Sequence, residues 1–158
     1  MTAKNAGKTE LSADSERFAK NMQILETARD QLKQEFIGLD TIIDEIVRQM
    51  SCWFVFPELQ ERPYIINLWG MTGVGKTALI KRLVELIGCT KGFASFDLGR
   101  GGTMGIDFHD LERIAWFERK IIALDEFQHA RTINERGEEE QMFSNRLIWD
   151  LLDSGVVR

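Results

Sequence analysis

One eight-residue motif constrains this chain more than any other feature of its sequence. It has the form G-x-x-x-x-G-K-[ST] and consists of Gly70, Met71, Thr72, Gly73, Val74, Gly75, Lys76 and Thr77. A short apolar run at 64–69 precedes it, and a helical pattern at 77–87 follows it. A glycine-rich turn between a buried strand and an amphipathic helix is the setting in which such a motif binds phosphate. The sequence therefore favours a phosphate-binding loop over a chance glycine-rich turn.

The residue types in the motif suit the chemistry of a nucleoside triphosphate. Glycines let successive backbone N–H groups point at phosphate oxygens, and the following helix adds the positive end of its dipole. Lys76 brings a positive charge to the β- and γ-phosphates, and the Thr77 hydroxyl is a ligand for Mg²⁺. We therefore expect residues 70–77, with the adjoining Ala78, to bind ATP and magnesium.

A second apolar run, 121–124, ends in two adjacent carboxylates, Asp125 and Glu126. Acidic residues often end strands, so this pair alone is a weak signal. At about fifty residues after a phosphate-binding motif, it is typical of a nucleotide hydrolysis site. We expect Asp125 to hold magnesium through water opposite Thr77, and Glu126 to act as the general base toward the attacking water.

The rest of the pattern predicts two N-terminal helices followed by alternating strands and helices. We expect a disordered lead-in at 1–11 and one nucleotide-binding domain at 12–158. The expected helices are 12–36, one beginning near 41, 77–87, 107–118 and 141–153, and the expected strands are 64–69, 93–97 and 120–125. This order argues for an α/β domain of three layers, in which helices cover both faces of a parallel sheet.

Together the two motifs resemble those of the AAA+ ATPases, a family of P-loop NTPases. The resemblance is greatest to Clp-type protein unfoldases. It rests on three segments: the motif sequence at 72–77, D-E-F-Q-H-A at 125–130, and the leucine-rich segment 147–155 that ends in D-S-G. The sequence D-E-F-Q-H also resembles the corresponding segment of AAA+ regulators of DNA transposition. The resemblance spans roughly residues 36–155.

The family resemblance implies adenine contacts and an oligomer. The segment F-I-G-L-D at 36–40 is similar to the family segment that lies against the base, which makes Ile37 and Gly38 the implied contacts. Leu39 stands where the family usually has Gln, and a plain helix break is the alternative interpretation. The family also implies a homo-oligomeric ring or filament in which a neighbouring subunit supplies an arginine for hydrolysis.

Two departures from the family bear on function. The glycine-rich stretch 99–105 lacks the aromatic residue with which unfoldases grip a threaded substrate. We interpret it as a flexible connector, and a loop that contacts phosphate or a partner is the alternative. The sequence ends before the family's sensor strand, arginine finger and helical lid. We expect the N-terminal portion of an AAA+ module, as a fragment of a longer protein rather than a natural truncation.

Composition narrows the choice of partners. The net charge of −5 does not favour a broad basic surface for nucleic acid, and two cysteines are too few for a disulfide scaffold. No run is long and apolar enough to span a membrane, so we expect a cytoplasmic protein. The predicted function is ATP binding and magnesium-dependent hydrolysis that drives remodelling of a protein or nucleoprotein partner. The alternatives are a DNA-linked regulator of transposition or mobile-element defence, and a nucleotide-binding scaffold that does not hydrolyse ATP.

Overall fold

The computed structural model of the 158-residue chain describes residues 3–70, 75–98, 108–127 and 143–154. Its helices and strands alternate in the second half of the chain, as the sequence pattern predicts. In chain order they are α1 (Ala3–Glu35), α2 (Asp40–Val55), the 3₁₀ turn η1 (Pro57–Leu59), α3 (Lys76–Leu86), the 3₁₀ turn η2 (Thr90–Gly92), β1 (Phe93–Asp97), α4 (Phe108–Ala115), β2 (Ile121–Asp125) and α5 (Phe143–Ser154).

The two strands pair in parallel, which confirms an α/β chain with a parallel sheet. The register runs from Phe93 opposite Ile121 to Asp97 opposite Asp125. Both strands are short apolar runs that end in aspartate. Because parallel strands bring their carboxyl ends to one edge, residues that follow β1 and β2 lie at the same side of the sheet.

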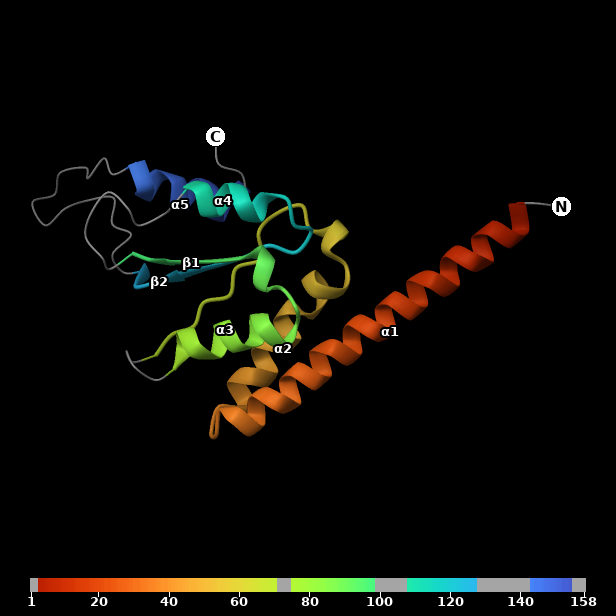
Figure 1. Cartoon of the computed structure of the whole chain (residues 1–158), viewed down its shortest axis with the longest axis horizontal. Coiled ribbons are helices and arrows are strands. Elements are labelled where there is room, and N and C mark those ends of the chain that lie inside the picture. Colours follow the sequence, from red (N-terminus) through yellow and green to blue (C-terminus); the bar gives the residue numbers. More distant parts are fainter. Residues whose placement is uncertain (1–2, 71–74, 99–107, 128–142, 155–158) are drawn as a thin grey trace, which may run out of the picture.

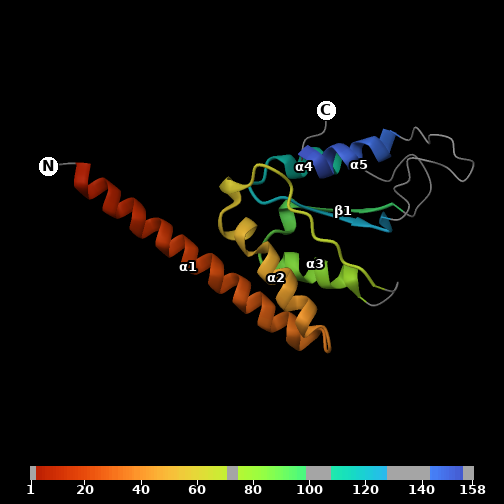
Figure 2. The same ribbon diagram turned by 180° about the vertical axis from the view of Figure 1, so that it is seen from behind.

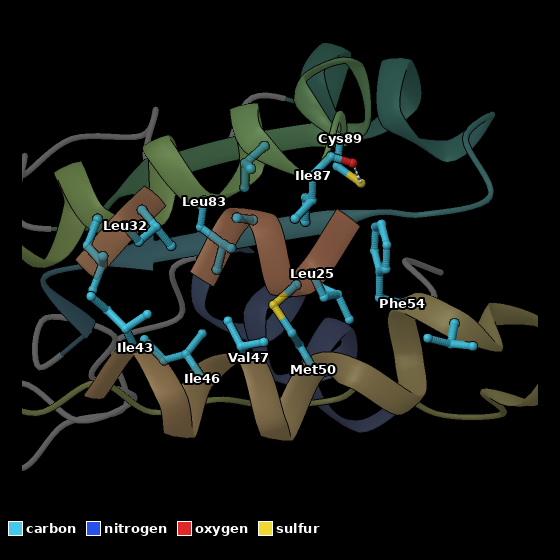
Figure 3. Close-up of a cluster of buried hydrophobic side chains, with 14 residues drawn as sticks. Leu25, Leu32, Ile43, Ile46, Val47, Met50, Phe54, Leu83, Ile87 and Cys89 are labelled. Carbon is cyan, nitrogen blue, oxygen red and sulfur yellow. Dashed lines mark hydrogen bonds between the residues drawn. The ribbon is translucent and has the colours of Figure 1, made fainter. Parts of the chain in front are cut away.

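Helices cover both faces of this sheet (Figures 1 and 2): α2 and α3 lie on one side, and α4 and α5 lie on the other. The strands alternate accordingly between two hydrophobic clusters. Phe93 and Ile121 pack against the cluster formed by α1, α2 and α3, whose side chains interdigitate in Figure 3. The second cluster lies under α4 and α5 and comprises Ala94, Phe96, Leu111, Ile114, Ile148 and Leu151, with Ile122 and Leu124 packed against it.

The expected strand at 64–69 does not form. Residues 63–70 have no strand or helix assignment, although Ile66 and Leu68 pack partly against the first cluster. Trp69 is 91% exposed, and Tyr64 and Ile65 are half exposed. A strand needs a hydrogen-bonded neighbour, and β1 and β2 pair with each other. The alternation of this segment is strand-like, but its hydrogen-bonding partner is missing from the described residues.

The first helix is longer than expected. It begins at Ala3 rather than near Ser12, so the structure differs from a disordered lead-in at 1–11. No proline interrupts the segment, and helix formation propagates readily once it has begun. Figures 1 and 2 show the N-terminal half of α1 extending away from the other elements.

The last turn of α1 is fixed to α3 by a forked ion pair. The guanidinium of Arg82 donates to both carboxylate oxygens of Glu35, through Nε at 2.7 Å and through a terminal nitrogen at 2.8 Å. Lys33 also reaches Asp44 of α2 at 2.6 Å. The turn between α1 and α2 is therefore held beside the helix that follows the glycine-rich motif.

Among the described residues, no helix is both long and apolar enough to cross a lipid bilayer.

Candidate functional site

The two sequence motifs meet through their side chains. Thr77, in the first turn of α3, donates a hydrogen bond from Oγ1 to Oδ2 of Asp125, at the end of β2, over 2.6 Å. The two residues are 48 positions apart and the contact is partly buried. Asp125 is fixed in turn, because its backbone carbonyl accepts a hydrogen bond from the N–H of Leu98 at 3.0 Å. The end of β2 is thus held against the start of α3.

Gly75 and Lys76 form the entry to α3. Gly75 precedes the helix in the left-handed conformation, with φ of 86°, a backbone geometry that glycine adopts without steric cost. Lys76 begins the helix, and its Nζ donates to the carbonyl oxygen of Gly70 at 2.9 Å. This hydrogen bond joins the two ends of the motif. Met71, Thr72, Gly73 and Val74 lie outside the described residues.

Glu126 follows Asp125 in an unusual backbone conformation. Its φ is 56°, which places a side-chain-bearing residue in the left-handed region, and its N–H donates to Oδ1 of Asp125 at 3.0 Å. The next residue, Phe127, meets Trp149 of α5 edge to face, with ring centroids 6.1 Å apart and an interplanar angle of 74°. Neither the left-handed conformation nor the aromatic pair is indicated by any sequence signal that we used.

The remaining expected site residues lie at two places. Ala78 is exposed in the first turn of α3, next to Thr77. Ile37 and Gly38 form the turn between α1 and α2, where Ile37 is 84% exposed. The Glu35–Arg82 ion pair holds this turn near α3, but Ile37 is not packed into a base-binding pocket in the described part of the chain.

The donor atoms that converge at Thr77 and Asp125 fit magnesium. Both are hard oxygen atoms, and Mg²⁺ typically takes only one or two protein ligands while it keeps water and phosphate oxygens around it. The described residues contain no group of three or more His, Cys, Asp or Glu side chains that could hold a metal ion without such help. A hydroxyl and one carboxylate therefore suit a magnesium ion that arrives with a nucleotide.

Comparison of the chain with protein-family models, with curated proteins and with solved structures gave no match. Function is therefore inferred from the two motifs and from the contact between Thr77 and Asp125.

Proposed function

We propose that this chain binds Mg·ATP through residues 70–78 and hydrolyses it in the manner of an AAA+ ATPase. One observation carries the proposal: Oγ1 of Thr77 lies 2.6 Å from Oδ2 of Asp125, the residue expected to hold magnesium opposite it. A chance glycine-rich turn gives no reason for its final hydroxyl to meet the carboxylate of a second motif. A shared metal-binding role does give one.

The side chains around this contact can be assigned roles. Helix α3 begins at Lys76, so the positive end of its dipole lies beside the motif and favours an anion there. In this proposal Lys76 exchanges its hydrogen bond to the Gly70 carbonyl for one to the β- and γ-phosphates. Its positive charge then offsets the charge that develops on the transferred phosphoryl group.

Thr77 and Asp125 would hold the magnesium ion that accompanies the nucleotide. A bound magnesium ion neutralises charge on the β- and γ-phosphate oxygens. Glu126 extends beyond Asp125 at the same edge of the sheet, where its carboxylate would accept a proton from the attacking water. The two adjacent carboxylates would thus have different roles: that of Asp125 would act on the metal ion, and that of Glu126 would act on the water.

The wider role follows from the family resemblance and belongs to the same proposal. We place the chain in a homo-oligomeric ring or filament that couples ATP turnover to remodelling of a protein or nucleoprotein partner in the cytoplasm. Ile37 and Gly38 would contact adenine at the turn that Glu35 and Arg82 hold beside α3.

Calorimetric titration with Mg·ATP and Mg·ADP tests the binding step. The wild type should bind both nucleotides, and Lys76→Ala should weaken binding at least tenfold because it removes the charge that contacts the phosphates. Lys81→Ala, which removes an exposed lysine of the same helix, is the matched control and should bind normally. Equal binding by the Lys76 variant, or no binding by the wild type, would refute the proposal.

Glu126→Gln separates hydrolysis from binding. This variant keeps the size of the side chain but cannot accept the proton of water, so it should bind Mg·ATP and release no phosphate. Turnover equal to that of the wild type would remove Glu126 from the role of base. Binding without turnover in the wild type itself would favour the non-hydrolysing scaffold.

A further inference from the structure

We infer that Trp149 is a positioning residue for Glu126, acting through the ring of Phe127. This inference rests on the proposed function, because it concerns how the residue proposed as the general base is held in position. The observation that carries it is the edge-to-face contact between Phe127 and Trp149, immediately after the left-handed backbone of Glu126.

Glu126 needs to be held from both sides. A residue with a side chain is sterically disfavoured at φ of 56°, and such a conformation persists only where the surrounding structure fixes it. On the N-terminal side, Asp125 is fixed by its pairing in β2, by the N–H of Leu98 and by the hydrogen bond from Thr77. On the C-terminal side, the described contact is that of Phe127 with Trp149.

Helix α5 is a firm support for this contact. Ile148 is fully buried and Leu151 nearly so, in the cluster against which Ile122 and Leu124 of β2 pack. The helix that carries Trp149 and the strand that leads to Glu126 therefore pack into the same hydrophobic cluster. Two sets of contacts therefore connect α5 to this part of the chain: the shared hydrophobic cluster and the ring contact of Trp149 with Phe127.

Trp149 itself contributes little to that core. Its side chain is 47% exposed, and its neighbours Ile148 and Leu151 supply the buried surface. Phe127 is also more than a third exposed. Edge-to-face packing is a preferred geometry of aromatic pairs, so the contact defines how the two rings lie relative to each other. The pair is therefore suited to orient the chain beyond Glu126, with a small share in the stability of the fold.

Without the Trp149 ring, Phe127 loses this contact, and the left-handed backbone at Glu126 loses one of the contacts that support it. The carboxylate then samples positions away from the attacking water. Because a displacement of about 1 Å at a catalytic group can cost on the order of 100-fold in rate, kcat should fall while phosphate binding by Lys76 and Thr77 persists.

Kinetics of two variants and a control provide the first test. Trp149→Ala should lower kcat about tenfold or more with an unchanged Kd for Mg·ATP, and Trp149→Phe, which keeps a ring, should restore most of the rate. Trp116→Ala removes a tryptophan that is 91% exposed beyond the end of α4 and should match the wild type. Thermal unfolding of each variant checks that the fold is retained. An unchanged kcat in Trp149→Ala, or the same loss in Trp149→Phe, would overturn the inference.

A spectroscopic test does not depend on turnover. The four tryptophans can be labelled with 5-fluorotryptophan, and the resonance of Trp149 assigned from its loss in Trp149→Phe. If Trp149 is coupled to Glu126, this resonance should differ between Mg·ATP and Mg·ADP, because the proposed base would face the γ-phosphate that only ATP carries. Phe127→Leu should abolish that difference. A resonance that is identical with both nucleotides, although calorimetry shows both bound, would also overturn the inference. Failure of the wild type to bind either nucleotide would refute the proposed function instead.

Discussion

The hydroxyl of Thr77 lies 2.6 Å from the carboxylate of Asp125, so the first turn of α3 and the end of β2 are joined by a side-chain hydrogen bond. Both partners have a second anchor. Thr77 belongs to a helix seated on the first hydrophobic cluster by Leu79 and Leu83, and Asp125 is the last residue of a paired strand. The contact therefore has a defined geometry without a ligand, and binding of a metal ion would replace one hydrogen bond rather than order two loose loops.

Asp125→Ala should remove the magnesium dependence of nucleotide binding. The wild type should bind ATP at least tenfold more tightly with magnesium than with EDTA, and the variant should show about the same weak affinity in both. Titration calorimetry with and without magnesium measures this. Asp97→Ala is the matched control, because Asp97 occupies the same position at the end of β1. Retention of the magnesium effect in Asp125→Ala would exclude this carboxylate as a ligand.

Gly75→Ala should cost conformational energy without a clash. No atom lies within 4 Å of the position of an added Cβ, but φ of 86° is unfavourable for alanine by about 1–2 kcal/mol. We expect the free energy of unfolding in urea to fall by about this amount and nucleotide affinity to fall with it. An unchanged unfolding midpoint would mean that the backbone at this position relaxes freely.

Gly92→Ala should be more damaging, for a different reason. An added Cβ would lie 2.2 Å from the carbonyl oxygen of Arg119, which is backbone and cannot rotate away. Arg119 is itself held by a hydrogen bond to the Phe54 carbonyl at 2.9 Å and by its position over the Phe54 ring. Overpacking of this kind typically costs about 1–3 kcal/mol.

Urea unfolding of Gly92→Ala measures that cost, with Ser95→Ala at an exposed position of β1 as the control. A loss of stability no greater than that of the control would show that β1 can move away from the segment that precedes β2.

The Glu35–Arg82 pair should make stability depend on pH in the acid range. The hydrogen bond from Arg82 lowers the pKa of Glu35, so the folded state binds a proton at this site less readily than the unfolded state. The stabilisation is complete above the unfolded pKa of about 4.3 and is lost as pH falls through the lower folded value. Glu35→Gln should therefore lower Tm at pH 7 and should differ little from the wild type near pH 3.

Thermal unfolding from pH 7 to pH 3 tests this, with Arg82→Gln and the double variant completing a cycle. Because Arg82 also pairs with Glu85, Arg82→Gln should cost at least as much as Glu35→Gln at pH 7, and the double variant should cost less than the sum of the two single variants. A difference in Tm that stays constant over the whole pH range would show that Glu35 does not act through its charge.

The sequence was most informative where local pattern and local structure coincide. The strand at 93–97 has the expected bounds, and the strand that ends at Asp125 begins one residue later than expected. Both are short apolar runs followed by polar or glycine-rich residues. The helix after Gly75 also lies where its spacing of apolar residues predicts.

Prediction was wrong where structure depends on distant partners. The run 64–69 has strand propensity, but propensity supplies no hydrogen-bonding neighbour. The ring contact of Phe127 with Trp149 and the forked pair of Glu35 with Arg82 each join parts of the chain that only the fold brings together. No local pattern in the sequence indicates the left-handed backbone of Glu126. Ile37 and Gly38 remain predicted base contacts.

The length of α1 makes it a lever with its pivot beside the candidate site. Its 33 residues span about 50 Å at 1.5 Å per residue, and its C-terminal turn is fixed to α3 by Glu35 and Arg82. A tilt of only a few degrees at that end would carry the far end through several ångströms. A fluorophore at Lys4 paired with one at the exposed Cys52 of α2 would therefore read a small tilt of α1 relative to α2 as a large change in distance.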